Sequence, residues 1–595
     1  VGGVLNLNGT EEEKVIITST IDEGNEVNLE NYWSKIYVNG TLNLKNTIFR
    51  YGGVTQNNRG ENVSCNYIEN TGTLNIDNLI LENMGTTGKG AGINGRGNIK
   101  IINTNDIGDI VVEKVTSLDI QDSKLNRISA RYTNQSSFES NINIERNEIN
   151  ENVDLIPTNG VVVKIKDNKF LGDYIPVEID MYYLSGEINI FDGITGNVST
   201  KNENRSEIHI YRFPASGTLN MPKKKYKEDS LYTDLNLTVN MEPGVIFVTN
   251  GFTVGGVLNL NGTEEEKVII TSETDEGNEV NLEDYWDSIN ISTNGILNIN
   301  NTELRYGGVT QNRGENVNCY YINNKGTLNV DNLTLASMGI DGNSSGIETE
   351  NGDIKILNSA NIGTVYIKNA NNIELNDNKL KNISINYSLN SKLNNIKINN
   401  NILENSILLE PNLASTIEIT NNSSINSYPV KIIPTNAVGE IFKNIKNNKN
   451  TTNNIYNSIY IEGIVNNHLI LTSNNSYNFG ILNVAKEGIL EIKDGITCKF
   501  EDDKSFKVDG VLIVDGTQNN NVNIKSIGDE NNKYFRGLII SDGGMAFINN
   551  LNLEYAGKND TFPIENKGAL FMFNSSIQNS ESNKSIFFNT RYLDQ

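Results

Sequence analysis

The chain has 595 residues and a formal net charge of −24, from 73 acidic and 49 basic side chains. This acidity opposes binding to DNA, RNA or an anionic lipid surface, and we interpret the one basic cluster, 223–227, as a solvated loop. Three cysteines and two histidines are too few for a disulfide framework or a histidine metal centre. No apolar run is long enough to cross a membrane, so we expect no direct membrane insertion by this segment.

A long internal repeat dominates the sequence. Residues 1–19 (VGGVLNLNGTEEEKVIITS) recur without change at 254–272, and a diverged third copy begins near Gly510. These are termed the first, second and third copies, and their period is about 253 residues. A period this long indicates a structure made by stacking. The strict identity also argues against two specialised active sites, because a recent duplication copies scaffold and loops together.

A shorter apolar pattern recurs within the first two copies, with positions spaced 0, +2 and +7. It is found at Leu42/Leu44/Phe49, Leu74/Ile76/Leu81, Leu118/Ile120/Leu125, Ile142/Ile144/Ile149, Val163/Ile165/Phe170, Leu297/Ile299/Leu304, Leu328/Val330/Leu335, Ile373/Leu375/Leu380 and Ile396/Ile398/Leu403. The +2 step is strand alternation, and the odd +5 step requires a change of register. Residues that tolerate left-handed backbone often lie at that change: Asn46, Asn78, Asp122, Asn301, Asn332, Asp377 and Asn400. Each pattern therefore predicts strand, sharp bend, strand.

Successive patterns begin mostly some 20 to 30 residues apart, which suits one solenoid coil for each pattern. Asn makes up about one residue in six, far above ordinary usage. Two interpretations of this excess stay open. One is an AT-rich genome, which also inflates Ile and Lys. The other is hydrogen bonding between Asn side chains stacked at equivalent bends of neighbouring coils.

The second copy resembles a known family. Residues 256–263 (GVLNLNGT), 268–272 (VIITS), the pair Tyr285-Trp286 and 304–308 (LRYGG) are similar to modules of bacterial surface and adhesin-like proteins with the pectate-lyase-like fold. The resemblance implies an all-β fold, a right-handed single-stranded parallel β-helix built from tandem units of about 253 residues, located outside the cell or at the bacterial cell surface. One departure is that Asp287 and Ser288 replace the glycines that usually follow the tryptophan.

The same resemblance sets the expected domain boundaries. Segments such as 241–247 and 493–497 precede the Gly-x-Leu start in that family, so full units begin near 207 and 458. We expect residues 1–206 to be a β-helix unit without its start, 207–457 a complete unit, and 458–595 a unit without its end. The chain is then a segment of a longer protein.

The sequence favours a non-enzymatic structural or adhesive segment, such as a stalk, fibre or adhesin. Parallel β-helices also house pectin-degrading lyases and hydrolases, which use paired carboxylates or calcium with an arginine base. Only fragments of such motifs occur here: 103–106 (NTND), Asp502-Asp503 and 212–214 (RFP), and neither His209 nor His468 lies in Gly-His-Gly. We assign no catalytic residue. The alternatives are a polysaccharide-binding or polysaccharide-degrading β-helix, of lyase, hydrolase or phage tailspike type, and a self-assembling filament subunit.

One loop is the candidate binding site. Tyr51 and Ile68 are 17 residues apart in the first copy, whereas the equivalent Tyr555 and Ile564 are 9 residues apart in the third. The extra length carries Gln56, Arg59, Glu61 and Asn62, repeated as Gln311, Arg313, Glu315 and Asn316. Polar side chains that project from a rigid coil suit sugar hydroxyls or a neighbouring protein, and an ordinary surface excursion is the alternative. The expected partner is a cell-surface glycan or protein, or another copy of the chain by lateral or end-to-end assembly.

Acidic turns offer a candidate cation site. Asp22, Glu23 and Glu26, repeated as Asp275, Glu276 and Glu279, are the oxygen ligands that calcium uses. Their spacing matches no known calcium loop, and the third copy has only Asp529-Glu530. We therefore expect solvated acidic turns and no cofactor, with calcium as the alternative.

The three cysteines are interpreted as packing residues. Cys65 and Cys319 occupy equivalent positions in the first two copies, too far apart along a solenoid to pair readily. We expect these two and Cys498 to be small, buried and unreactive side chains.

Overall fold

The computed structural model describes residues 1–22, 27–57, 60–85, 92–131, 140–201, 207–228, 231–275, 280–312, 315–339, 346–388, 394–412, 415–472, 475–528, 533–581, 584 and 586–588. In these ranges the helices are short 3-10 turns and the remaining regular structure is β-strand. The turns are η1 (Leu29–Asn31), η2 (Ile190–Gly193), η3 (Leu282–Asp284), η4 (Asn454–Tyr456) and η6 (Lys558–Asp560).

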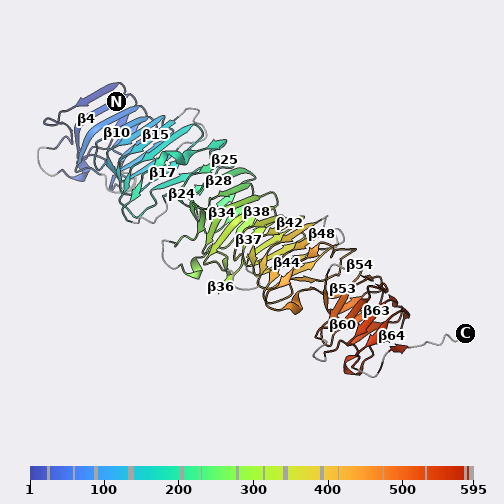
Figure 1. Cartoon of the computed structure of the whole chain (residues 1–595). Helices are drawn as coiled ribbons and strands as arrows, with labels where there is room; N and C mark the ends of the chain where they lie inside the picture. The colour runs from blue at the N-terminus through green and yellow to red at the C-terminus, as the bar shows by residue number, and fades with distance from the viewer. Residues whose placement is uncertain are drawn as a thin grey trace. The chain divides into compact units, whose positions relative to one another are not determined.

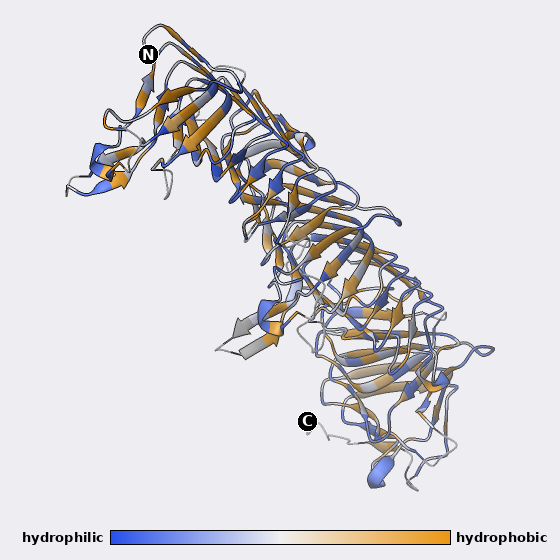
Figure 2. Ribbon diagram, turned by 90° about the vertical axis from the view of Figure 1, so that its left-hand side faces the viewer, coloured by the Kyte–Doolittle hydropathy of each residue, from blue (hydrophilic) through white to orange (hydrophobic). Residues whose placement is uncertain are grey.

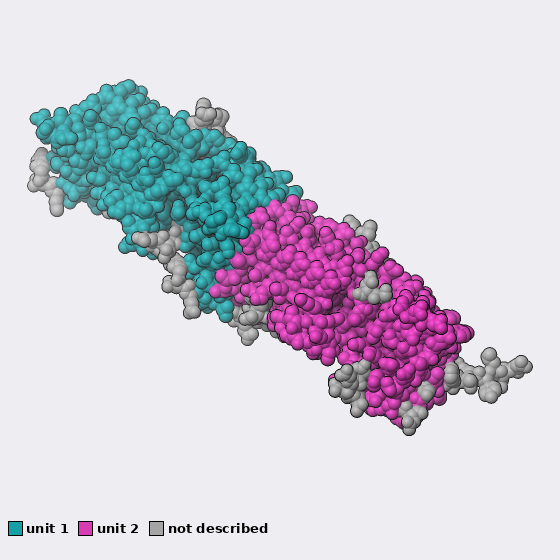
Figure 3. Space-filling view, in the orientation of Figure 1, with its two compact units in different colours: residues 1–286, 301–306 teal, residues 287–300, 307–595 magenta. Residues whose placement is uncertain are grey.

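The chain divides into two compact units (Figure 3). Unit 1 contains Val1–Trp286 and Asn301–Tyr306, and unit 2 contains Asp287–Asn300 and Gly307–Gln595. This spatial division does not test the repeat boundaries at 206 and 457, which stay predictions.

Unit 1 is built from rows of parallel strands, one strand per coil in each row (Figure 1). The first row contains β1 (Val4–Asn8), β4 (Thr41–Arg50), β8 (Thr73–Glu82), β10 (Asn98–Ile102), β12 (Ser117–Gln121), β15 (Ser140–Glu145), β18 (Val161–Lys166) and β22 (Ile194–Thr195), with β2 (Val15–Ile17) beside β4. The second contains β3 (Ile36–Val38), β7 (Ile68–Asn70), β9 (Gly92–Gly95), β11 (Asp109–Glu113), β14 (Arg127–Arg131), β17 (Val153–Ile156), β20 (Val177–Asp180), β24 (Ile208–Arg212), β26 (Lys225–Lys227), β29 (Ile246–Val248) and β32 (Val268–Thr271).

Shorter rows complete unit 1. The corner row is β13 (Lys124–Leu125), β16 (Glu148–Ile149), β19 (Lys169–Phe170) and β23 (Val198–Ser199). Further rows are β21 (Glu187–Ile188), β25 (Ser216–Met221), β28 (Asn236–Met241) and β31 (Val257–Asn261), and the pair β27 (Leu231–Thr233) and β30 (Phe252–Val254). β34 (Ile296–Arg305) contains the boundary between the units.

Unit 2 repeats this arrangement. One row contains β38 (Thr327–Ala336), β40 (Asp353–Leu357), β42 (Asn372–Asn376), β45 (Asn395–Asn399), β48 (Thr416–Thr420) and β51 (Ile445–Lys446), and its corner row is β43 (Lys379–Leu380), β46 (Ile402–Leu403), β49 (Ser423–Ser424) and β52 (Lys449–Asn450). A third row is β54 (His468–Leu471), β56 (Ile489–Lys493), β59 (Val511–Asp515), β62 (Met545–Asn549) and β65 (Ala569–Phe573). All these pairings are parallel, so the predicted parallel β-helix is confirmed.

The longest row of unit 2 forks at β55. Its strands are β33 (Ile289–Ile291), β37 (Tyr320–Asn324), β39 (Gly346–Glu350), β41 (Thr364–Lys368), β44 (Asn382–Asn386), β47 (Ile407–Glu410), β50 (Val430–Ile432), β53 (Ile459–Val465), β55 (Tyr477–Val484), β57 (Thr497–Phe500), β58 (Ser505–Val508), β60 (Val522–Ser526), β61 (Gly537–Ile540), β63 (Leu551–Glu554), β64 (Ile564–Asn566), β66 (Ser576–Gln578) and β67 (Ile586–Phe588). β55 is long enough to pair with both β57 and β58.

The predicted bends are confirmed. All seven Asn and Asp residues named for the register change have positive φ, from 43° at Asn301 to 60° at Asn400. β4 continues through the bend at Asn46, whereas in a later coil Asp122 separates β12 from β13. A short polar side chain lowers the steric cost of this conformation, which explains why these positions avoid branched residues.

The core is the narrow space enclosed by the rows, and its buried residues are mainly apolar. Figure 2 shows hydrophobic and hydrophilic residues interspersed along the strands. The 0 and +2 residues of all nine patterns are buried. The +7 prediction is wrong at Leu81 and Leu335, which are half-buried, while Leu79 and Leu333 are buried in their place. The residue directly after the left-handed residue is buried in other coils too, as at Thr47, Ser123 and Thr302, so Leu81 and Leu335 differ from the pattern only at the +7 position.

Asn side chains form ladders from coil to coil. Two ladders are buried except for a half-buried last member: Asn147, Asn168 and Asn197 in unit 1, and Asn378, Asn401, Asn422 and Asn448 in unit 2. Asn401 Nδ2 donates to Asn422 Oδ1 (2.9 Å) and to the Leu375 carbonyl (2.7 Å), while its Oδ1 accepts from the Asn378 backbone N–H (3.0 Å). In these ladders the amide residue is the one after the left-handed residue, since Asn400 has the positive φ. The predicted ladder between left-handed residues occurs at Asn46 and Asn78, where Asn78 Nδ2 donates to Asn46 Oδ1 (2.7 Å).

The buried ladder predicts a specific stability loss. Asn401→Ala leaves a backbone carbonyl and a backbone N–H of neighbouring coils without partners, so we expect unfolding to require about 2–3 kcal/mol less free energy. The control is Asn43→Ala in a half-buried ladder, which water can replace, with an expected loss below about 0.5 kcal/mol. Urea unfolding followed by circular dichroism measures both. Equal losses would contradict the role given to the buried amide.

Candidate functional site

The candidate loop is an antiparallel hairpin in both copies. In unit 1, β5 (Val54–Gln56) pairs with β6 (Asn62–Ser64), and Gln56 lies opposite Asn62. In unit 2, β35 (Val309–Asn312) pairs with β36 (Glu315–Asn318), and Gln311 lies opposite Asn316. Figure 1 labels β36 in the hairpin that projects from the coils of unit 2. The two hairpins therefore have one register, and each departs from the parallel coil that carries it.

A tryptophan holds the entry to the first hairpin. Trp33 Nε1 donates to the Arg50 carbonyl (2.7 Å), and its backbone N–H donates to the Tyr51 carbonyl (3.0 Å). A Cβ on Gly52 would lie 2.0 Å from the Trp33 ring, so only glycine fits against it. In the second copy Trp286 makes the same two bonds, to Arg305 and Tyr306.

The tyrosine at this point is strained in all three copies, within Arg-Tyr-Gly in the first two and Glu-Tyr-Ala in the third. Tyr51, Tyr306 and Tyr555 have φ values of 51°, 53° and 54°. This conformation is rare for a bulky residue and persists only where the surrounding contacts determine it. The direction in which the chain leaves the coil is therefore fixed at this tyrosine, before the hairpin begins.

The hairpin returns to the coil at a second fixed point. The Cys65 N–H donates to the Gly53 carbonyl (2.8 Å), and the buried Tyr67 hydroxyl donates to the Ile107 carbonyl (3.0 Å). Cys319 and Tyr321 repeat these bonds with Gly308 (2.8 Å) and Ile362 (2.9 Å). Burial raises the pKa of both tyrosines, so their hydroxyls stay protonated donors.

The tip of the first hairpin is polar and closed by its own side chains. Asn57 Nδ2 donates to Glu61 Oε2 (2.7 Å), and Asn57 Oδ1 accepts from the Glu61 N–H (3.0 Å). Gln56 and Asn62 are exposed beside this closure. Glu61 is therefore a structural residue of the tip, and Asn57, which the sequence prediction omitted, is its partner. An Asn that begins a turn is the signal that identifies such a residue.

Several predicted site residues cannot be compared. Arg59 and Arg313 lie outside the described residues, as do the side chains of Gln311, Glu315 and Asn316. What the described part offers is an amide pair, Gln56 and Asn62, on two paired strands. Amides both donate and accept hydrogen bonds, which suits hydroxyl groups or a polypeptide backbone.

The acidic turns are partly described. Thr18 Oγ1 donates to Asp22 Oδ2, and Thr271 Oγ1 donates to Asp275 Oδ2, both over 2.6 Å. Glu23, Glu26, Glu276 and Glu279 lie outside the described residues. In the described ranges no three His, Cys, Asp or Glu side chains form a metal-binding group.

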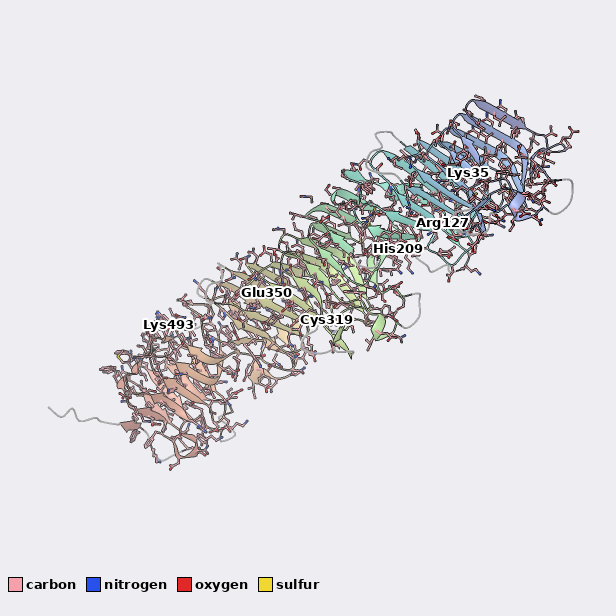
Figure 4. The ribbon with its side chains drawn as sticks, turned by 180° about the vertical axis from the view of Figure 1, so that it is seen from behind. Lys35, Arg127, His209, Cys319, Glu350 and Lys493 are labelled. Carbon is pink, nitrogen blue, oxygen red and sulfur yellow. The ribbon has the colours of Figure 1, made fainter. Side chains whose placement is uncertain are left out.

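The enzyme-like fragments lie in ion pairs. Asp503 Oδ1 accepts from Arg536 Nε (3.0 Å), which lowers the pKa of Asp503, and Asp502 pairs with Lys558. Arg212 pairs with Asp180, and its guanidinium lies 4.8 Å from the centre of the Tyr182 ring. The ring of His209, labelled in Figure 4, lies 4.5 Å from that of Tyr211, with 44° between the ring planes. These contacts give the fragments local structural roles.

The cysteine prediction is only partly correct. Cys498 is buried, but Cys65 and Cys319 are half-buried. Their side chains sit beside the coil of Ser34 and Asp287, where Cys319 Sγ donates to Asp287 Oδ1 (3.3 Å). Burial, together with this carboxylate, raises the pKa of the Cys319 thiol to about 12.

Comparison with protein-family models, curated proteins and solved structures gives no significant match. The fold is therefore established by its strand pairing. In the described ranges no helix is both long and apolar enough to span a membrane.

The thiol environment predicts slow alkylation. In a Cys65→Ser/Cys498→Ser background, Cys319 should react with iodoacetamide at pH 8 roughly 10³-fold more slowly than a free thiol, because so little thiolate is present. The rate should continue to rise with pH up to about 12. Asp287→Asn should accelerate labelling. Labelling of the folded single-cysteine protein at the rate of a free thiol at pH 8 would refute this description.

Proposed function

We propose that this chain is a non-enzymatic repeat segment of an extracellular bacterial surface protein, a stalk or adhesin that displays binding hairpins. The supporting observation is the pair of hairpins β5–β6 and β35–β36, which have the same register at equivalent positions of two copies. A structure that repeats a projecting polar hairpin supplies several weak contacts to one surface, and weak contacts add strongly when linked.

The base of the hairpin supports this proposal. Trp33, Tyr51 and Gly53 fix the point of departure through hydrogen bonds and a left-handed backbone. A loop held in this way loses little conformational entropy when its exposed tip binds a partner. The coils serve as a scaffold, and each coil lengthens its unit by about 4.8 Å.

The proposed partner is a glycan or protein on another cell surface. The tip presents Gln56 and Asn62 rather than an apolar patch, which suits a polar ligand. The resemblance to β-helical modules of bacterial surface proteins supports the same setting. Calcium has no role in this proposal.

A groove in unit 1 favours a second candidate, polysaccharide binding. It has a volume of about 670 Å³ and lies between β18 and η2. Polar and charged lining residues include Asn159, Lys164, Lys166, Glu187, Asn189 and Asp192. Amides with charged groups of both signs suit the hydroxyl groups of a glycan, and this candidate requires no hairpin.

Trimming the hairpins tests the first proposal. Residues 56–62 and 311–316 are each replaced by Asn-Gly, which removes the presented amides and is the shortest turn that preserves the remaining strand pairs of each hairpin. Beads coated with this variant should be retained on host cells or a glycan array at least tenfold less than beads coated with the parent chain. The melting temperature should change by less than about 2 °C, because the base contacts remain. Unchanged retention would refute the display role.

Enzyme activity is tested separately. We expect no new reducing ends and no unsaturated products from pectin, alginate or other acidic glycans, measured at 0.1 mM chain with and without calcium. Product formation that Glu187→Gln/Asp192→Asn abolishes would replace the proposal with a polysaccharide-degrading function of the groove.

A further inference from the structure

The outer face of one sheet in unit 2 is unusually apolar. The sheet contains β54, β56, β59, β62 and β65. Its pairing register puts five outward residues in one row from coil to coil: Ile470, Glu491, Ile513, Phe547 and Phe571. This set is termed the third-copy row, since its last three members belong to the third copy.

The same positions are polar in the other two copies. Three residues of the row have equivalents in the other copies. Ile513, Phe547 and Phe571 are equivalent to Asn6, Asn43 and Asn75 of the first copy, and to Asn259, Asn298 and Asn329 of the second. Those asparagines form amide ladders, with Asn43 Nδ2 donating to Asn6 Oδ1 (2.6 Å) and Asn329 Nδ2 donating to Asn298 Oδ1 (2.8 Å). Three equivalent positions have therefore changed from amide to apolar while the fold has stayed the same.

The two phenylalanines of the row are exposed, and Ile470 and Ile513 are half-buried. Phe547 is 43% and Phe571 48% exposed, and Met545 and Phe573 beside them are 40% and 62% exposed. Strands β59 and β65 flank β62 on both sides, so the exposure of Phe547 is toward solvent at the outer face. An apolar cluster of this kind on a soluble surface indicates an interaction site.

Ring geometry argues against sugar stacking. The Phe547 and Phe571 rings are parallel, 5.0 Å apart with 4° between their planes. Their faces are directed at one another along the stack, so Phe547 presents its edge to the outside. A sugar stacks on a ring face, whereas ring edges and Met545 suit contact with other apolar side chains.

Charges on this face compensate one another. The outward positions of the five strands carry His468, Glu491, Lys493 and Asp515. Glu491 pairs with His468 (2.9 Å) and Lys493, and Lys493, labelled in Figure 4, also lies 3.8 Å from Asp515. Each carboxylate of this set therefore has a basic partner on the same face. Two copies of this face can therefore meet without an unpaired run of like charges between them.

We propose that this face binds the same face of a second copy in a two-fold symmetric dimer. Flat sheet faces pack about 10 Å apart with interdigitating side chains, and the apolar residues here supply the contact. Five strands and three outward positions cover roughly 400 Å², half of the area per partner in a standard interface. The dimer is therefore weak and concentration-dependent.

Sedimentation velocity of the full chain tests the dimer. The weight-average mass should rise from 65.9 kDa toward twice that value between about 1 and 500 µM. Phe547→Asn/Phe571→Asn restores the residues of the other two copies, so this variant should fold normally and remain at 65.9 kDa throughout. Circular dichroism and the melting temperature confirm its fold. A parent chain that stays monomeric, or a variant that associates equally, would overturn the proposal.

Two controls locate the interface. Asn298→Ala/Asn329→Ala changes the equivalent polar row and should leave association intact. A photo-crosslinking amino acid at Ile513 should give covalent dimers, whereas the same group at the equivalent Asn259 should not. Dimers crosslinked from both positions, or from Asn259 alone, would place the contact elsewhere and refute the third-copy row.

Discussion

Hydrogen bonds between parallel strands of successive coils hold each residue against its counterpart one coil away. In the first copy, Leu42 pairs with Leu74, Asn43 with Asn75 and Leu44 with Ile76. The separation of about 4.8 Å is fixed by the backbone and not by the side chains. Every side chain must therefore tolerate a close neighbour at the same position, and each residue type meets this requirement in its own way.

Apolar residues meet the requirement by packing, and charged residues by alternating in sign. Lys100 faces Asp119, Glu350 faces Lys368, and Lys355 faces Glu374, each pair in register between adjacent coils. Asn meets it without a partner of another type, because its amide donates to one coil and accepts from the other. Ladders such as Asn378 to Asn448 thus stabilise the corner, because their amides bond backbone N–H and carbonyl groups that an apolar side chain would leave without hydrogen bonds.

The sequence predicted what depends on neighbours along the chain. The bends were predictable because left-handed backbone restricts the residue type at that position, and the strands because alternation has a fixed period. The partial exposure of Leu81, and the second ladder at the residue after the bend, depend on the adjacent coil. The hairpin strands could not be predicted because they have no apolar periodicity. The role of Asn57 could not be predicted because it depends on the hydrogen bonds that Asn57 makes with Glu61.

Because the register is fixed, inward residues maintain the fold while outward residues can change without affecting it. Leu42, Leu297 and Ala546 occupy equivalent inward positions and all are buried, so the core role has persisted through the divergence of the copies. The neighbouring outward positions hold Asn43, Asn298 and Phe547. An outward substitution changes neither the bend nor the backbone pairing, and because equivalent positions stack, three such substitutions form a continuous surface. In a solenoid of this kind a binding surface arises from a few changes along one row, while the inward rows alone maintain the coil.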